Sequence, residues 1–289
     1  MSSKKGKFSS QDKQYMNLAI NLARSRNGLT GNNPSVGCVI VKNNNIISIG
    51  QTGYSGRPHA EYNAIKNSIE KVNGSKMYIT LEPCNHYGQT PPCTNNIIKN
   101  GIKEVYYSID DIDKKVKGKS FNILEKKKIK VQKGLLKEKA KDLYESYLCN
   151  RLYKLPYVTG KIAITKNKLI YSYGNKRITD TFSDKLTHFL RYKNDAILIS
   201  HQTLLKDNPK LNCRLKGYEK FSPIRIILDR NLEIKQSSYI FKSSKKKNTF
   251  IFHNSLNFDK IRILKKRGIT LIKLKTNQDN LFNLNKILK

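Results

Sequence analysis

The sequence predicts an α/β protein made of two domains, and three observations support this. Apolar segments of strand length alternate with amphipathic helical segments along the whole chain. A length of 289 residues is enough for two domains that each bury a core. A helical pattern over 135–152 is followed by Pro156 and a new apolar segment, so we place the boundary there, with domains at 1–152 and 153–289.

The first domain is expected to form an α/β/α sandwich of three layers. Its first helix has Ser9 or Ser10 as its cap, apolar residues at helical spacing over 15–23, and Gly28 as its end. A hairpin then joins strands 36–41 and 46–49. The further expected elements are a helix over 59–70, a strand over 77–81, a helix through 97–98 and a strand over 105–108.

The second domain repeats this alternation without a detectable sequence repeat. We expect strands at 157–164, 196–199, 224–229, 249–252 and 270–272, helices at 180–192 and 258–267, and an amphipathic stretch that runs to Lys289.

The net charge of +35 arises from 56 Lys and Arg against 21 Asp and Glu. Such a field attracts nucleic acids and phosphorylated small molecules. The excess is mostly scattered Lys, however, and only 126–128 and 245–247 form runs, so we do not expect nucleic acid as a partner. No apolar run approaches the roughly 18 residues of a membrane span. Five cysteines and a polar N-terminus favour a reduced, cytoplasmic protein.

Three short segments contain the ligand types of a zinc site. His59, Cys84 and Cys93 supply one imidazole and two thiolates, and a catalytic zinc typically takes three protein ligands. Glu61 lies two residues after His59 and is left for proton transfer. Prolines precede His59 and Cys93, so we expect both at helix N-termini, with Thr90 as a cap of the second helix. The remaining cysteines, Cys38, Cys149 and Cys213, lack such neighbours and are interpreted as packing residues.

This set of residues predicts hydrolytic deamination. Zinc lowers the pKa of bound water from 15.7 to roughly 7. Glu61 would take the released proton and deliver it to the departing amine. An H-x-E motif followed by two cysteines is typical of zinc deaminases in general.

The first domain resembles the bifunctional riboflavin-biosynthesis deaminase/reductase family. The resemblance is carried by 33–41, by His59 to Glu61 and by 81–93, and it covers nearly all of 10–150. Eight residues separate Cys84 from Cys93, whereas nucleic-acid deaminases generally have two there. The resemblance implies a cytidine-deaminase-like fold. The implied substrate is a small molecule, 2,5-diamino-6-ribosylamino-pyrimidinone 5′-phosphate. Asn33 and His86 would hold its pyrimidine, and Thr52 departs from the histidine common in the family.

The second domain resembles the reductase half of the same family, which has a dihydrofolate-reductase-like fold and uses NADPH. The resemblance implies cofactor contacts from Ala163, Thr203 and Asp207, and substrate contacts from Arg191, Leu211 and Arg214. Segment 165–169 lacks the family's glycine, and 175–177 lacks its tryptophan. The chain also stops at Lys289, before the family's glycine-rich loop. We therefore expect an incomplete domain with weak or absent reductase activity.

Two other functions stay open on the sequence alone. One is a zinc deaminase that acts on a base in RNA, with the positive charge as its footprint. The other is a non-catalytic, zinc-stabilised module whose second domain mediates assembly. Homo-oligomerisation is also left open.

Overall fold

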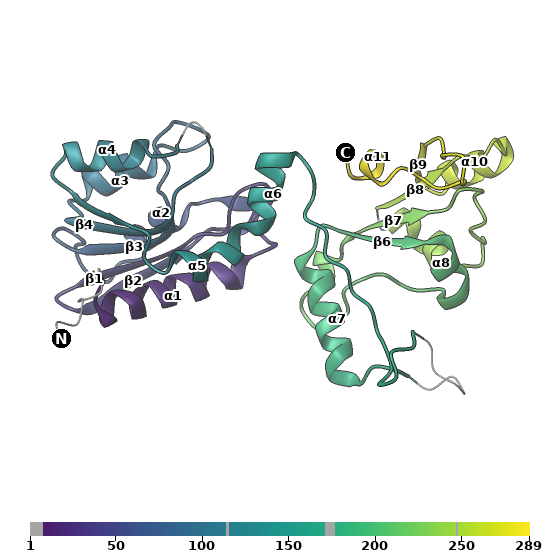
Figure 1. Ribbon diagram of the computed structural model, residues 1–289, viewed down its shortest axis with the longest axis horizontal. Coiled ribbons are helices and arrows are strands. Elements are labelled where there is room, and N and C mark those ends of the chain that lie inside the picture. Colours follow the sequence, from purple (N-terminus) through teal and green to yellow (C-terminus); the bar gives the residue numbers. More distant parts are fainter. Residues whose placement is uncertain (1–7, 114–115, 171–176, 247) are drawn as a thin grey trace. The chain divides into compact units, whose positions relative to one another are not determined.

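The computed structural model describes residues 8–113, 116–170, 177–246 and 248–289. Its chain divides into two compact units, Met1–Tyr157 and Val158–Lys289. Both units combine helices with a β-sheet, as Figure 1 shows. The α/β class predicted from the sequence is therefore confirmed.

The first unit is built on a mixed sheet with the strand order β2-β1-β3-β4-β5. Its strands are β1 (Gly37–Lys42), β2 (Asn45–Gln51), β3 (Lys76–Leu81), β4 (Glu104–Ile109) and β5 (Lys130–Lys133). Strand β1 runs antiparallel to both neighbours, and Cys38 pairs with Ile79 of β3. Strands β3, β4 and β5 are parallel. Strand β3 is therefore the central strand, and the loop with Cys84 begins at its carboxyl end.

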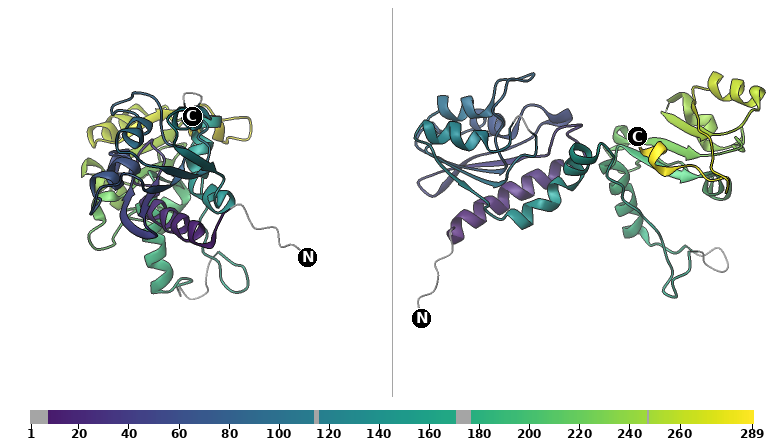
Figure 2. Two further views of the ribbon diagram at one scale, coloured as in Figure 1. Left: turned by 90° about the vertical axis from the view of Figure 1, so that its left-hand side faces the viewer. Right: turned by 45° about the horizontal axis from the view of Figure 1, so that its top comes forward.

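Helices cover both faces of this sheet and complete the three layers (Figures 1 and 2). The helices are α1 (Ser10–Arg26), α2 (Ala60–Lys66), α3 (Cys93–Lys99), α4 (Lys119–Lys126), α5 (Lys137–Lys141) and α6 (Glu145–Tyr153). Helices α1 and α5 lie on one face, and α2, α3 and α4 lie on the other (Figure 1). The core between these layers is apolar and includes the fully buried Met16, Ile40, Ile79 and Ile97.

Helix α1 begins at the predicted cap. The Ser9 hydroxyl accepts from the Asp12 backbone N–H at 3.1 Å, and the Asp12 carboxylate accepts from the Ser9 N–H at 2.9 Å. This capping box satisfies two backbone donors that a helix start otherwise leaves unpaired. The helix ends before Asn27 and Gly28, and Gly28 adopts a φ of 81°.

Two glycines allow helices to approach strands β1 and β2 closely. An ideal Cβ on Gly37 would lie 1.9 Å from the Ala19 carbonyl oxygen of α1. A Cβ on Gly50 would lie 2.2 Å from the Ala60 carbonyl oxygen of α2 and 2.5 Å from the Ala64 nitrogen. Helix α2 begins next to His59 and includes Glu61, so the missing side chain at Gly50 fixes how closely these two residues approach the sheet.

Gly50→Ala is expected to lower the free energy of unfolding of the first unit by about 3 kcal/mol, because the added methyl group forces α2 off β2. Urea titration of the purified protein measures this change. Gly160→Ala is the control, since no atom lies within 4 Å of a Cβ at Gly160. Equal stability of the two variants would contradict the close packing of α2 on β2.

The second unit contains a parallel sheet with the order β6-β7-β8-β9. Its strands are β6 (Ala196–Ser200), β7 (Ile224–Leu228), β8 (Thr249–His253) and β9 (Thr270–Lys273). Its helices are α7 (Thr181–Lys193), α8 (His201–Asp207), α9 (Tyr239–Ser243), α10 (Phe258–Lys266) and α11 (Leu284–Leu288). Leu204, Ile227, Ile251 and Leu264 are buried in its core.

Two elements differ from the sequence-based expectation. Residues 157–164 form no strand, and Val158, Ile162 and Ile164 are exposed. A strand needs partners for its backbone groups, and among the described residues no strand pairs with this segment. The helix expected over 135–152 is interrupted by a 3-10 turn at Asp142–Tyr144. The buried Tyr144 hydroxyl lies 2.6 Å from Thr80 Oγ1, so the break coincides with a side chain that is fixed in the core.

None of the helices in the described part of the chain is long and apolar enough to cross a membrane.

Candidate active site

The three expected zinc ligands converge at the ends of three different elements. His59 is the N-cap of α2, Cys93 is the first residue of α3, and Cys84 lies in the loop after β3. Their ligand atoms lie within 4.8 Å of one another, and no other such group occurs among the described residues. Because His59 precedes the first helical turn, it and Glu61 escape the rule that residues two apart face away from each other on a helix.

The distances within this cluster fit a tetrahedral zinc ion. His59 Nδ1 lies 3.3 Å from Cys93 Sγ and 3.5 Å from Cys84 Sγ. Zinc bonds of 2.0 Å to nitrogen and 2.3 Å to sulfur at a tetrahedral angle place these atoms about 3.5 Å apart. Nδ1 is therefore the imidazole atom that faces the metal position. The donor set and its spacing both fit zinc.

The pKa values of the two cysteine thiols shift in opposite directions. The hydrogen bond from the Cys93 thiol lowers the pKa of Cys84, and His59 and the Cys93 backbone N–H act in the same direction. That backbone N–H lies 3.3 Å from Cys84 Sγ. The pKa of Cys93 is raised by the same thiol pair and by burial. These contacts favour the thiolate form of Cys84, and thiolates are the form of cysteine that binds metals.

Glu61 is buried beside the cluster, with only 4% of its surface exposed. Burial raises the pKa of its carboxyl, while the imidazole of His59 acts in the opposite direction. Its carboxylate contacts the Cys93 thiol. A carboxyl with a raised pKa at this position can hold a proton and pass it on, as a general acid and base must.

The residues expected to hold the pyrimidine lie in the loops around this cluster. His86 belongs to the loop between Cys84 and Cys93, and its Nδ1 is buried without a hydrogen-bond partner in the described structure. Asn33 donates from Nδ2 to the Gly56 carbonyl at 3.2 Å. Thr52 is buried and bonds the Val36 backbone N–H at 2.9 Å, so it fixes the backbone between β2 and α2.

One detail of the expected helix starts is wrong. Thr90 does not cap α3, because the N-cap is Pro92 and no side-chain cap is present. The Thr90 hydroxyl instead accepts from Arg57 Nη1 at 2.5 Å. Pro58 precedes His59, which is the N-cap of α2 as expected, and the peptide bond between Arg57 and Pro58 is cis.

Glu82 is a site residue that the sequence analysis missed. Its buried carboxylate accepts backbone N–H groups of Asp111 at 3.2 Å, Gly118 at 3.1 Å and Ser120 at 3.2 Å. The Ser120 hydroxyl donates to the Pro83 carbonyl at 2.6 Å. Burial raises the pKa of Glu82 and the backbone donors lower it. These bonds tie the loop before α4 to the backbone next to Cys84.

Glu82→Gln is expected to weaken zinc binding about 10- to 100-fold, because one of three backbone donors would face an amide N–H₂ and the Cys84 backbone would shift. Competition with a coloured chelator measures the affinity. Glu125→Gln is the matched control, since the Glu125 carboxylate also accepts a backbone N–H, that of Val131 at 2.8 Å. Unchanged zinc affinity in Glu82→Gln would contradict the positioning role.

In the second unit, the expected substrate residues surround Asn212. Arg191 donates to the Asn212 carbonyl at 3.1 Å, and Arg214 donates to its side-chain oxygen at 3.0 Å. Leu211 is buried beside them. Burial and the nearby Arg214 lower the pKa of Arg191. Two guanidinium groups are therefore held close together, which suits a phosphate.

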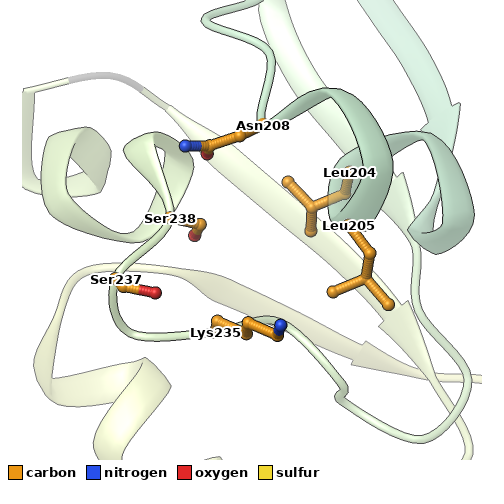
Figure 3. Close-up of a pocket in the computed structure, with 6 residues that line it drawn as sticks. All are labelled: Leu204, Leu205, Asn208, Lys235, Ser237 and Ser238. Atoms are coloured by element: carbon orange, nitrogen blue, oxygen red, sulfur yellow. The ribbon is translucent and has the colours of Figure 1, made fainter.

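The expected cofactor residues of this unit are less closely gathered. Thr203 and Asp207 lie one turn apart on α8, whereas Ala163 belongs to the irregular segment 157–164. A pocket beside α8, shown in Figure 3, contains none of the three. It is lined by Leu204, Leu205, Asn208, Lys235, Ser237 and Ser238.

Segment 165–169 keeps a tight turn without glycine. Lys168 adopts a φ of 63°, a conformation that favours glycine. Bonds between Thr165 and Leu169 close this turn. The other departure from the family pattern is the missing tryptophan in segment 175–177. Residues 175 and 176 lie outside the described residues.

Comparisons with known proteins agree with this architecture. The profile of the cytidine and deoxycytidylate deaminase zinc-binding region matches residues 9–109, and that of the RibD C-terminal domain matches residues 168–288. Riboflavin biosynthesis protein RibD of Aquifex aeolicus is 39% identical over 280 residues, which cover 96% of this chain and 76% of that protein. RibD of Bacillus amyloliquefaciens is 38% identical, over 79% of this chain and 62% of its own length.

A solved structure gives the same result. The crystal structure of a diaminohydroxyphosphoribosylaminopyrimidine deaminase/5-amino-6-(5-phosphoribosylamino)uracil reductase from Thermotoga maritima superposes with a TM-score of 0.78 at 32% identity, covering 91% of this chain and 80% of that one. The resemblance noted in the sequence is thereby confirmed. The chain belongs to the RibD family of riboflavin biosynthesis proteins.

Proposed function

We propose that the first unit catalyses the zinc-dependent hydrolytic deamination of 2,5-diamino-6-ribosylamino-pyrimidinone 5′-phosphate in riboflavin biosynthesis. The observation that carries this proposal is the placement of the buried Glu61 beside the cluster of His59, Cys84 and Cys93. Zinc held by these three residues supplies Lewis acidity, which makes water a nucleophile at neutral pH.

Residues of the chain transfer the proton and bind the pyrimidine. Glu61 accepts the proton that the attacking water loses and delivers it to the leaving amine, so that one water is consumed and one ammonia is released. The unpartnered Nδ1 of His86 and the amide of Asn33 offer hydrogen bonds to the edge of the pyrimidine.

Ammonia release tests this function. The purified, zinc-loaded protein is expected to release one ammonia per molecule of pyrimidine phosphate. Absence of release with zinc bound would overturn the proposal and favour a non-catalytic module. Tight, salt-dependent binding of RNA together with ammonia release from RNA would favour the alternative deaminase.

We further propose that the second unit reduces the ribose of the deaminated product with NADPH, and that it does so slowly. Arg191 and Arg214 would hold the phosphate, as their position around Asn212 supports. The slow rate is expected because segment 165–169 lacks glycine, so side chains hinder the close approach of a ligand to the backbone. NADPH oxidation with the deaminated product as substrate measures the rate. Oxidation as fast as ammonia release would contradict the expected weakness, and complete absence would contradict a reductase.

A further inference from the structure

Arg57 lies at the edge of the zinc cluster and has no acidic partner. Its guanidinium is half-buried, with Nη1 at 3.3 Å from His59 Nε2 and at 2.5 Å from Thr90 Oγ1. Among the described residues, no Asp or Glu forms an ion pair with it. A cation withdrawn from solvent without a counter-ion is costly, and an anionic ligand would offset this cost.

The second ring nitrogen of His59, Nε2, also needs a hydrogen-bond acceptor. Its Nδ1 faces the thiols, so metal binding there leaves the hydrogen of the neutral imidazole on Nε2. Nε2–H then faces an N–H of Arg57. Two donors at this distance repel each other unless an acceptor lies against both. Since the Thr90 oxygen already accepts from Arg57, its hydroxyl hydrogen is a third donor at the same place.

We propose that Arg57, Nε2–H of His59 and the Thr90 hydroxyl together bind the phosphate of the deaminase substrate. This inference rests on the proposed function of the first unit. A phosphate offers the several acceptor oxygens that three converging donors require, and the guanidinium fork matches two of them.

Arg57 is the only Lys or Arg in the three segments that contain the zinc ligands, Glu61 and the expected pyrimidine contacts. The chain carries 56 Lys and Arg, yet segments 30–41, 52–65 and 82–98, which form the site, contain Arg57 alone of these types. Thr52 is buried and bonded to backbone. The loop between Cys84 and Cys93 also approaches Arg57 at Gly88, where an added Cβ would lie 3.6 Å from Nη2.

A structural role of Arg57 is the competing explanation, since its bond to Thr90 also links the loop before α2 to the loop after Cys84. The two roles predict different responses to the phosphate. Loss of a structural link weakens binding of every ligand, whereas loss of a phosphate contact weakens only phosphorylated ones.

Equilibrium binding separates these roles. In a Glu61→Gln background, which prevents turnover, calorimetry compares the pyrimidine riboside 5′-phosphate with the dephosphorylated riboside. Arg57→Met is expected to weaken binding of the phosphate about 10- to 100-fold and to leave riboside binding and zinc content unchanged. Arg57→Lys keeps the charge and loses the guanidinium fork. Its affinity for the phosphate is expected to lie between those of the Arg57→Met variant and the protein with Arg57.

Lys66→Met is the control, because Lys66 is an exposed cation at the far end of α2 from His59. It removes the same charge and is expected to change neither affinity. Equal weakening of both ligands by Arg57→Met, or no weakening of either, would overturn the phosphate site. If the Glu61→Gln protein bound neither ligand while holding zinc, the proposed deaminase function would fall, and the assignment of Arg57 with it.

Discussion

Glu61→Gln is expected to retain zinc and to lose about 10²- to 10⁴-fold in the rate of ammonia release, the range that general acid and base catalysis contributes. The substituted amide has nearly the same shape but takes no proton from water and delivers none to the amine. The carboxylate is buried, so solvent has poor access to replace it. Steady-state ammonia production and zinc content, measured on the same preparation, give the two readouts.

The control for this experiment is Glu70→Gln, which neutralises a carboxylate with half of its side-chain surface exposed. It is expected to leave both the rate and the zinc content unchanged. Ammonia release at the normal rate by the Glu61→Gln protein would remove Glu61 from the mechanism. Loss of zinc from that protein would instead assign Glu61 to the structure of the metal site.

His59→Ala is expected to abolish stoichiometric zinc and with it all deaminase activity. The imidazole is the sole nitrogen donor of the cluster in the described structure, and two thiols alone leave the ion with half of its tetrahedral ligands. Metal analysis after dialysis measures the loss, and circular dichroism shows whether the fold is kept. Zinc also stabilises the folded state by binding it alone, so the unfolding temperature is expected to fall.

His86→Ala is the matched control for His59→Ala. Both changes remove an imidazole from the site, but the His86 side chain is outside the ligand cluster. The His86 variant is expected to keep its zinc and to bind the pyrimidine more weakly. Normal zinc content in His59→Ala would reject the assignment of this ligand.

The zinc cluster was predictable because the residues next to each ligand in the sequence indicate its place at the end of a helix or strand. His59 and Cys93 each follow a proline at a helix N-terminus, and Cys84 follows a strand and a proline, so local sequence already describes the three positions. The supporting shell was not predictable in the same way. Glu82 bonds backbone N–H groups that lie 29 to 38 residues further along the chain, and any residue type supplies such a donor.

Arg57 shows another limit of the sequence. Its assignment rests on its contacts with His59 and Thr90, and the contact with Thr90 becomes visible only when two distant loops are brought together. In a chain with 56 Lys and Arg, one arginine before a proline carries no signal by itself. Its contact with Thr90 spans 33 residues.

The strand expected at 157–164 failed for a related reason. It is rich in residue types that favour strands, such as Tyr, Val and Ile, but side-chain composition does not supply the neighbouring backbone on which a strand depends. Val158 and Ile162 are accordingly 65% and 70% exposed. Strands β6 to β9, by contrast, pair with one another in consecutive order and were all anticipated.

X-ray absorption at the zinc edge of the purified, undialysed protein tests the central claim most directly. We expect one zinc per chain, with one imidazole nitrogen and one further light atom at about 2.0 Å and two sulfurs at about 2.3 Å. A protein without stoichiometric zinc, or a zinc shell that lacks sulfur, would contradict the assignment of His59, Cys84 and Cys93.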